Sequence, residues 1–164
     1  MTIFVKNKHT LQIKEFKFRC CVGKKGFTSN KKEGDKKTPK GTFEVENLYF
    51  RKDRKEKPLT LLKCIKIKNN MGWCDDIRFP KKYNKLFKIQ KKIKCEKLKR
   101  RDNKYDFLIP IKYNFKKPII GRGSCIFIHL TKDYKPTAGC VALKEKDFLI
   151  MLKLIKKSSK IKIF

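Results

Sequence analysis

Residues 124–130 read SCIFIHL, and residues 136–143 read PTAGCVAL. The first run is almost wholly apolar, which is typical of a strand that lies inside a sheet. Side chains alternate along a strand, so Cys125, Phe127 and His129 are expected on one face. The histidine falls near the strand end, where a side chain can leave the core and face a cleft.

The cysteine of the second run follows this histidine by 11 positions. A thiol nucleophile needs a base and hydrogen-bond donors for the oxyanion of a tetrahedral intermediate. His129, Cys140 and the main-chain amides around Gly139 and Cys140 offer these groups within a short span. Two other interpretations remain open from the local pattern, namely half of a metal site and a pair of buried structural residues.

Alternating apolar residues and turn residues divide most of the rest of the chain into strands. Phe16, Phe18, Cys20 and Val22 share one face of a half-buried strand, and Pro110 suggests an edge or a bulge. Apolar spacing of three and four predicts a helix over residues 144–157. Residues 83–101 fit either a helix or a lysine-rich loop. The expected strands cover residues 16–22, 42–50, 61–68, 105–114, 124–130 and 160–164. The fold class is therefore mainly β with one or two helices, a β-sandwich or β-rich α+β domain.

Composition places limits on function. A length of 164 residues suits one domain with its own core. The net charge of +31 would attract a polyanion such as nucleic acid, an anionic membrane or an acidic wall polymer. Compositional bias toward lysine explains the charge equally simply, because lysines interrupt almost every segment rather than gathering in one block.

The seven cysteines do not form a recognisable framework. No C-x-x-C spacing occurs, and the adjacent Cys20 and Cys21 are unsuited to an ordinary bridge. Most cysteines are therefore expected to be free structural thiols, with no metal site. The N-terminus lacks a signal-peptide pattern, and no run approaches the length of a membrane span. Taken alone, these features predict a cytoplasmic chain.

Five pieces of sequence occur in an order that resembles the YkuD-type L,D-transpeptidase family. They are GDKKTPKGTFEV, GWCDD, YNK, GRGSCIFIHL and PTAGCVAL, and the resemblance covers roughly residues 16–164. The family pattern pairs a strand-end histidine with a downstream Ser/Thr-His-Gly-Cys. The second histidine of that pattern is Ala138 here, and the motif PTAGCVAL resembles a compact subgroup.

The resemblance implies a fold, an activity and a set of residues. It implies a single YkuD-like β-sandwich of mixed sheets over residues 1–164. Cys140 would be the nucleophile, His129 the general base and acid, and Gly139 a donor of an oxyanion N–H. A thiolate–imidazolium pair would form, with His129 oriented by a carbonyl near Leu130, and no metal or cofactor would be needed.

A substrate-binding set is also expected, although each member has a structural alternative. Trp73 could form a cleft wall or pack in the core, and Tyr113 could contact substrate or end a strand. Asp75 and Asp76 could meet an amine acceptor or form a turn. The expected substrate-binding residues are Thr137, Ala138, Trp73, Tyr113 and Gly123.

The implied substrates are peptidoglycan stem peptides, and the location implied is the periplasm or cell envelope, against the cytoplasmic alternative. A peptidoglycan or muropeptide amide hydrolase could use the same cysteine and histidine with water. In a different class, a basic polyanion- or nucleic-acid-binding module would fit the charge. No RRM, KH, helix-turn-helix or zinc-finger signature favours that module, so specific nucleic-acid binding is not expected. We expect a monomer without a membrane span.

Overall fold

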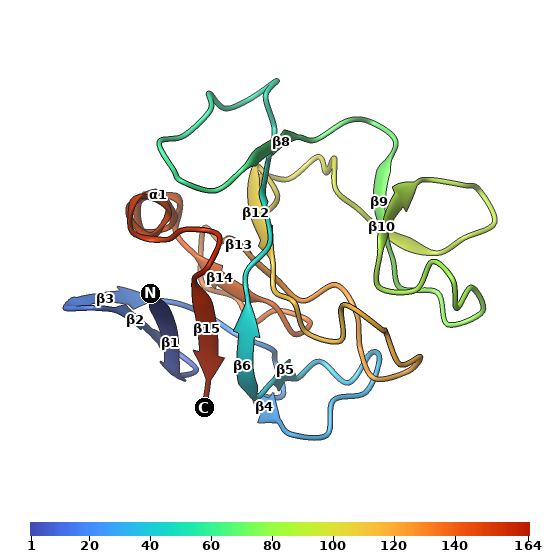
Figure 1. The fold of residues 1–164 in the computed structure, drawn as a ribbon, viewed down its shortest axis with the longest axis horizontal. Helices are drawn as coiled ribbons and strands as arrows, with labels where there is room; N and C mark the ends of the chain where they lie inside the picture. Colours follow the sequence, from blue (N-terminus) through green and yellow to red (C-terminus); the bar gives the residue numbers. More distant parts are fainter.

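Two five-stranded sheets form the framework of the computed structural model, which describes residues 1–164. The first sheet has the order β3-β2-β1-β15-β6, and the second has the order β14-β13-β12-β7-β8. Figure 1 shows the first sheet at the lower left, with α1 seen end-on above it and the second sheet beside both. The predicted mainly β architecture of mixed sheets with one helix is confirmed.

The first sheet joins the two ends of the chain. Its alternate side chains are buried, as in a sheet with one solvated face. The parallel pair β1–β15 sets Ile3 opposite Ile161 and Val5 opposite Ile163. The strands are β1 (Thr2–Asn7), β2 (Thr10–Ile13), β3 (Phe16–Arg19), β6 (Gly41–Glu44) and β15 (Lys160–Ile163).

The second sheet carries the apolar run of residues 124–130, and its strand β13 lies inside the sheet as predicted. β13 pairs antiparallel with β12 and parallel with β14, and all four of its residues are buried. The strands are β7 (Leu48–Phe50), β8 (Cys64–Lys66), β12 (Phe107–Pro110), β13 (Phe127–Leu130) and β14 (Val141–Leu143).

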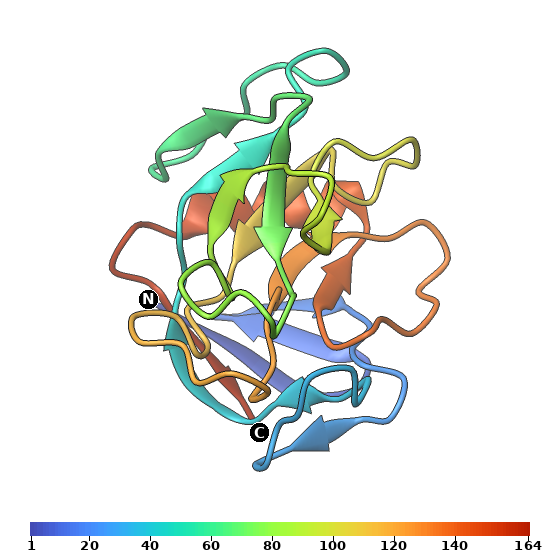
Figure 2. The ribbon, with the colours of Figure 1, turned by 90° about the vertical axis from the view of Figure 1, so that its right-hand side faces the viewer.

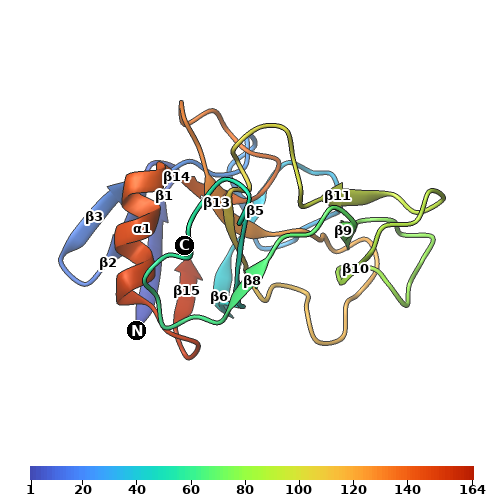
Figure 3. The ribbon, with the colours of Figure 1, turned by 90° about the horizontal axis from the view of Figure 1, so that it is seen from above.

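The two faces of β13 belong to different hydrophobic clusters. Ile126, Ile128 and Leu130 join the large core between the two main sheets. Phe127 joins a smaller cluster around Trp73, which fills the space toward a three-stranded lobe. Figures 2 and 3 show this lobe on the side of the second sheet away from α1. The lobe consists of β9 (Met71–Cys74), β10 (Leu86–Lys88) and β11 (Cys95–Lys97), and a separate pair is formed by β4 (Phe27–Thr28) and β5 (Thr38–Pro39).

The predicted helix is confirmed, with the bounds Glu145–Leu154 for α1. Phe148, Met151 and Leu152 are buried against the large core. The Phe148 ring stacks on Phe107 of β12 with 6.0 Å between ring centroids. The helix therefore covers one face of the second sheet and leaves the other face for the smaller cluster.

The structure excludes two of the alternatives that the sequence left open. Residues 83–101 contain no helix, because Leu86 pairs with Trp73 across β10–β9 and Cys95 pairs with Cys74 across β11–β9. Pro110 is not on an edge strand, since β12 lies between β13 and β7. It is the last residue of β12, where its carbonyl accepts the N–H of Glu46 and no donor is required of it.

A matched pair of leucine substitutions tests the position of the core. Leu143 is 0% exposed on β14, whereas Leu59 is 77% exposed. Leu143→Ala should lower the free energy of unfolding by about 2–5 kcal/mol, because it removes buried methyl groups and leaves a cavity. Leu59→Ala should change it by less than about 0.5 kcal/mol. Urea titration measures both, and equal effects would contradict this packing.

Candidate active site

His129 and Cys140 line one cavity of about 600 Å³. In the parallel pair β13–β14, His129 lies opposite Ala142. Cys140 precedes Ala142 by two positions, so the strand alternation directs both functional side chains to the same face of the sheet. Their exposed fractions are only 6% for His129 and 8% for Cys140.

The Cys140 sulfur is held by the segment that leads into β13. Its thiol donates to the main-chain oxygen of Cys125 at 3.2 Å, and it accepts the main-chain N–H of Phe127 at 3.3 Å. The first contact favours the protonated thiol, and the second favours the thiolate. Both states of the sulfur therefore have a partner in place.

The imidazole of His129 is oriented by its own strand. Its Nδ1 lies 2.8 Å from the main-chain oxygen of Leu130, in agreement with the carbonyl that the family resemblance implies. A carbonyl oxygen can only accept, so Nδ1 carries the proton and Nε2 is left as the basic nitrogen. The ring of Tyr105 packs edge-on against the imidazole, with 5.3 Å between ring centroids.

Burial sets the resting charge of this pair. Removal from water, assisted by the nearby positive charges of Lys104 and Arg100, lowers the pKa of His129 from 6.5 to about 4. Burial raises the pKa of Cys140 from 9.0 to about 12, although the Phe127 amide opposes this rise. Without substrate, the structure therefore favours a neutral thiol beside a neutral imidazole rather than the thiolate–imidazolium pair expected from the sequence.

The expected oxyanion donor at Gly139 already has a partner. The Gly139 N–H donates to Oγ1 of Thr137 at 3.1 Å, and the Thr137 hydroxyl donates to the Cys140 carbonyl at 2.6 Å. The N–H of Cys140 has no hydrogen-bond acceptor within the protein. The free main-chain donor beside the sulfur is therefore the amide of Cys140, and Thr137 shapes the turn that presents it.

Gly139 is required for the backbone of this turn. Its φ is +144°, and an added Cβ would lie 2.9 Å from the Lys37 carbonyl oxygen. The buried hydroxyl of Thr38 donates to the Gly139 carbonyl at 2.8 Å and accepts the N–H of Gly23 at 2.8 Å. Thr38 lies in the stretch GDKKTPKG, but nothing in that stretch predicts its hydrogen bond to the distant Gly139.

Two of the five expected substrate-binding residues line the cavity, namely Thr137 and the exposed Ala138. Trp73 does not, because it is 3% exposed and lies in the smaller hydrophobic cluster. Its indole N–H donates to Oδ1 of Asn84 at 2.9 Å. The structure therefore places Trp73 outside this cavity, and core packing, the alternative for this residue, explains its position.

Tyr113 and Gly123 also lie outside the residues that line the cavity. The Tyr113 hydroxyl donates to the carbonyl of Arg122 at 2.6 Å and so ties a loop together. The Gly123 N–H donates to the Tyr83 hydroxyl at 3.1 Å, which fixes the backbone just before Ser124. Ser124 itself lines the cavity, in agreement with a loop of Gly121, Gly123 and Ser124 that approaches the cleft.

Charged side chains of both signs surround the cavity. A neighbouring cavity of about 690 Å³ shares Glu33, Asp75 and Lys94 with it but contains neither His129 nor Cys140. Of these two cavities, the smaller one contains both the histidine and the cysteine. The charged residues that line it are Lys31, Glu33, Asp75, Lys94, Glu96, Arg100, Lys104, Asp133 and Lys135. No group of three or more His, Cys, Asp or Glu side chains is arranged to hold a metal ion.

Comparison with known families gives one match. The model of the family described as YkuD, L,D-transpeptidase catalytic domain, matches residues 1–163. No curated protein and no solved structure matches the chain. None of its helices is both long enough and apolar enough to cross a membrane.

Lowering the pH should destabilise the folded protein through His129. Because the pKa falls from 6.5 to about 4 on folding, the unfolded chain binds a proton between these values that the folded chain does not. The contribution to stability is complete above pH 6.5 and is lost as the pH falls toward 4. The free energy of unfolding should drop by roughly 3 kcal/mol from this source.

Urea titrations near neutral pH and at about pH 4 measure this effect. His129→Gln should lose this part of the pH dependence, since glutamine does not titrate. The exposed His9 provides the control, because His9→Gln should keep the pH dependence of the wild type. Equal acid destabilisation of all three proteins would contradict a neutral buried imidazole.

Proposed function

Because this chain belongs to the YkuD family of L,D-transpeptidase catalytic domains, we propose that it is a cysteine acyltransferase that works through a thioester on Cys140. The family indicates an L,D-transpeptidase-type enzyme that acts on peptidoglycan. The observation that carries the finer proposal is the shared cavity of Cys140 and His129, with Nδ1 of His129 bonded to Leu130. We treat residues 1–164 as one catalytic domain.

The first step is attack on the substrate carbonyl. The thiol proton of Cys140 passes to Nε2 of His129 while the sulfur bonds to the carbonyl carbon of the stem peptide. Since the resting pair is neutral, the proton moves as the bond forms. The carbonyl oxygen becomes an oxyanion that the Cys140 amide can bind. One such donor contributes about 2.7–4 kcal/mol in comparable sites.

Collapse of this intermediate releases the first product. The C–N bond to the terminal D-residue breaks, and the proton on His129 Nε2 passes to the leaving amine. The acyl group stays on Cys140 as a thioester. His129 is again a neutral base, ready to take a proton from the next nucleophile.

The second half of the reaction releases the acyl group. An amine of a second stem attacks the thioester carbonyl and gives its proton to His129. The C–S bond then breaks, and the proton returns to the sulfur. Water in place of the amine would give a hydrolase with the same residues, so the acceptor decides between the two activities.

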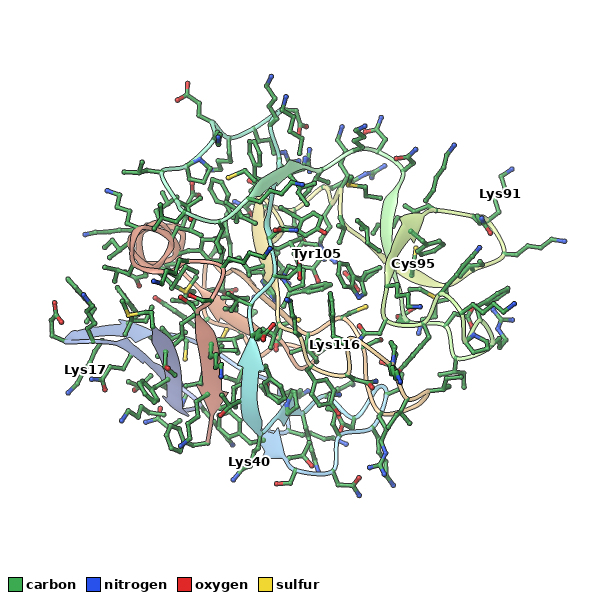
Figure 4. The ribbon with its side chains drawn as sticks, viewed as in Figure 1. Lys17, Lys40, Lys91, Cys95, Tyr105 and Lys116 are labelled. Atoms are coloured by element: carbon green, nitrogen blue, oxygen red, sulfur yellow. The ribbon has the colours of Figure 1, made fainter.

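The positively charged side chains are not concentrated around this cavity. Nitrogen-tipped side chains project around the whole outline in Figure 4, where Lys17, Lys40 and Lys91 lie at separate edges. This distribution supports the interpretation of lysine as compositional bias over that of a polyanion-binding patch. Members of the family typically act outside the cytoplasm, and we propose the cell envelope as the location.

Mass spectrometry of the protein with tetrapeptide muropeptides tests the proposal. We expect a transient acyl adduct on Cys140, together with crosslinked dimers. Cys140→Ala should abolish both, and His129→Ala should reduce turnover by on the order of 10⁴-fold. Cys64→Ala is the control, because this thiol lies on β8 outside the cavity, and it should turn over like the wild type.

The products distinguish transpeptidation from hydrolysis. Hydrolysed tripeptides without dimers would assign the hydrolase activity instead. Turnover that persists in Cys140→Ala would reject the thioester mechanism.

A further inference from the structure

Tyr105 has no role in the acyl transfer described above, although its ring packs against His129. Tyr105 is 7% exposed and lines the same cavity as His129 and Cys140. It lies between the second sheet and the β9–β11 lobe (Figure 4). Buried tyrosine hydroxyls normally find a hydrogen-bond partner, yet no protein group bonds to this one.

The unpartnered oxygen is open to the cavity. Among side-chain nitrogen and oxygen atoms that are fully enclosed, only Oδ1 of Asp75 lacks a partner. The Tyr105 oxygen is therefore not enclosed by protein and retains contact with the cavity space. A polar group in this position is satisfied by whatever enters the cavity.

The ring of Tyr105 is held in place on several sides. It packs edge-on against His129 and against Phe127, with ring centroids 5.3 and 5.8 Å away. The Arg100 guanidinium lies 4.9 Å from the ring centroid. Because Phe127 also donates its amide to the Cys140 sulfur, one residue positions both the nucleophile and the tyrosine.

The hydroxyl stays protonated at any pH at which the protein works. Burial raises the pKa of Tyr105 well above 10.0, and negative charge at Cys140, Glu96 and Cys125 would raise it further. A developing negative charge beside it therefore meets an O–H that donates.

The main chain beside the Cys140 sulfur offers one free N–H donor for an oxyanion. The Gly139 amide is bonded to Thr137, so the Cys140 amide is the free donor that remains beside the sulfur. We propose that the Tyr105 hydroxyl is a second catalytic donor, which binds the oxyanion formed when the Cys140 sulfur adds to the substrate carbonyl. This inference rests on the proposed acyl transfer. The hydroxyl keeps its proton, and no bond to the tyrosine forms or breaks.

Tyr105→Phe isolates the hydroxyl, since the ring and its packing are retained. Acyl transfer to muropeptide acceptors should fall by on the order of 100-fold. Alkylation of Cys140 by iodoacetamide should keep the rate and pH profile of the wild type, because displacement of iodide creates no oxyanion. Peptide mapping follows this alkylation in the same samples. The two readouts separate an oxyanion donor from a residue that only activates or positions the thiol.

Tyr49→Phe is the matched control. Tyr49 is also buried, has a hydroxyl without a protein partner and packs edge-on against an aromatic ring, that of Trp73. It lines a separate cavity of about 190 Å³. This variant should retain both acyl transfer and alkylation.

Three outcomes would overturn the inference. They are acyl transfer in Tyr105→Phe at the wild-type rate, a parallel loss of acyl transfer and alkylation, and an equal loss in Tyr49→Phe. In each of these the wild type still transfers acyl groups, so the proposed function survives. A wild type that forms no acyl adduct on Cys140 would instead reject that function and this inference with it.

Discussion

His129 and Ala142 lie opposite each other in the parallel pair β13–β14, and this register holds the site together. A slip of one residue would turn Cys140 toward the large core and away from His129. Hydrogen bonds on both sides of β14 prevent the slip. Thr131 donates its N–H to the Leu143 carbonyl, while Cys21 exchanges two main-chain hydrogen bonds with Ala142. The connection between β13 and β14 is therefore anchored at both ends, which keeps Cys140 on the same face of the sheet as His129.

The second sheet also acts as a partition between two chemical environments. On one side, Ile128 packs into a core shared with α1 and the first sheet. On the other, Phe127 and Cys140 belong to a smaller cluster that merges into the cavity. The same aromatic packing that removes water from the cysteine makes its thiolate costly. Stability and reactivity are thus linked. Packing that excludes water holds the Cys140 side chain in place, but it also disfavours the thiolate, so the thiol proton leaves only when substrate is bound.

Sequence patterns predicted those parts of the fold that depend on residues close together in the chain. The apolar run of β13 and the helical stripe of Phe148 and Met151 follow from neighbouring residues. The partnership of His129 with the Leu130 carbonyl was instead implied by the family resemblance. The pairing of β1 with β15 joins opposite ends of the chain, and no periodicity in either strand specifies the other. Residues 83–101 have helix-like apolar spacing that pairing with β9 overrides. Thr38 and Tyr105 act through distant backbone or cavity contacts, so their roles required the folded structure.

The overall positive charge and the burial of the site have opposite effects on the pKa of Cys140, and the direction of the pKa shift shows which effect is larger. A strongly positive protein should lower the pKa of a cysteine, and Lys31 and Arg100 do act on Cys140 in that direction. The pKa of Cys140 nevertheless rises to about 12, because loss of hydration outweighs these nearby cations. Charges at the outer edges are farther away and are screened beyond about 10 Å at 0.1 M salt. Desolvation by the aromatic wall, and not the charge of +31, therefore sets the protonation state from which the reaction starts.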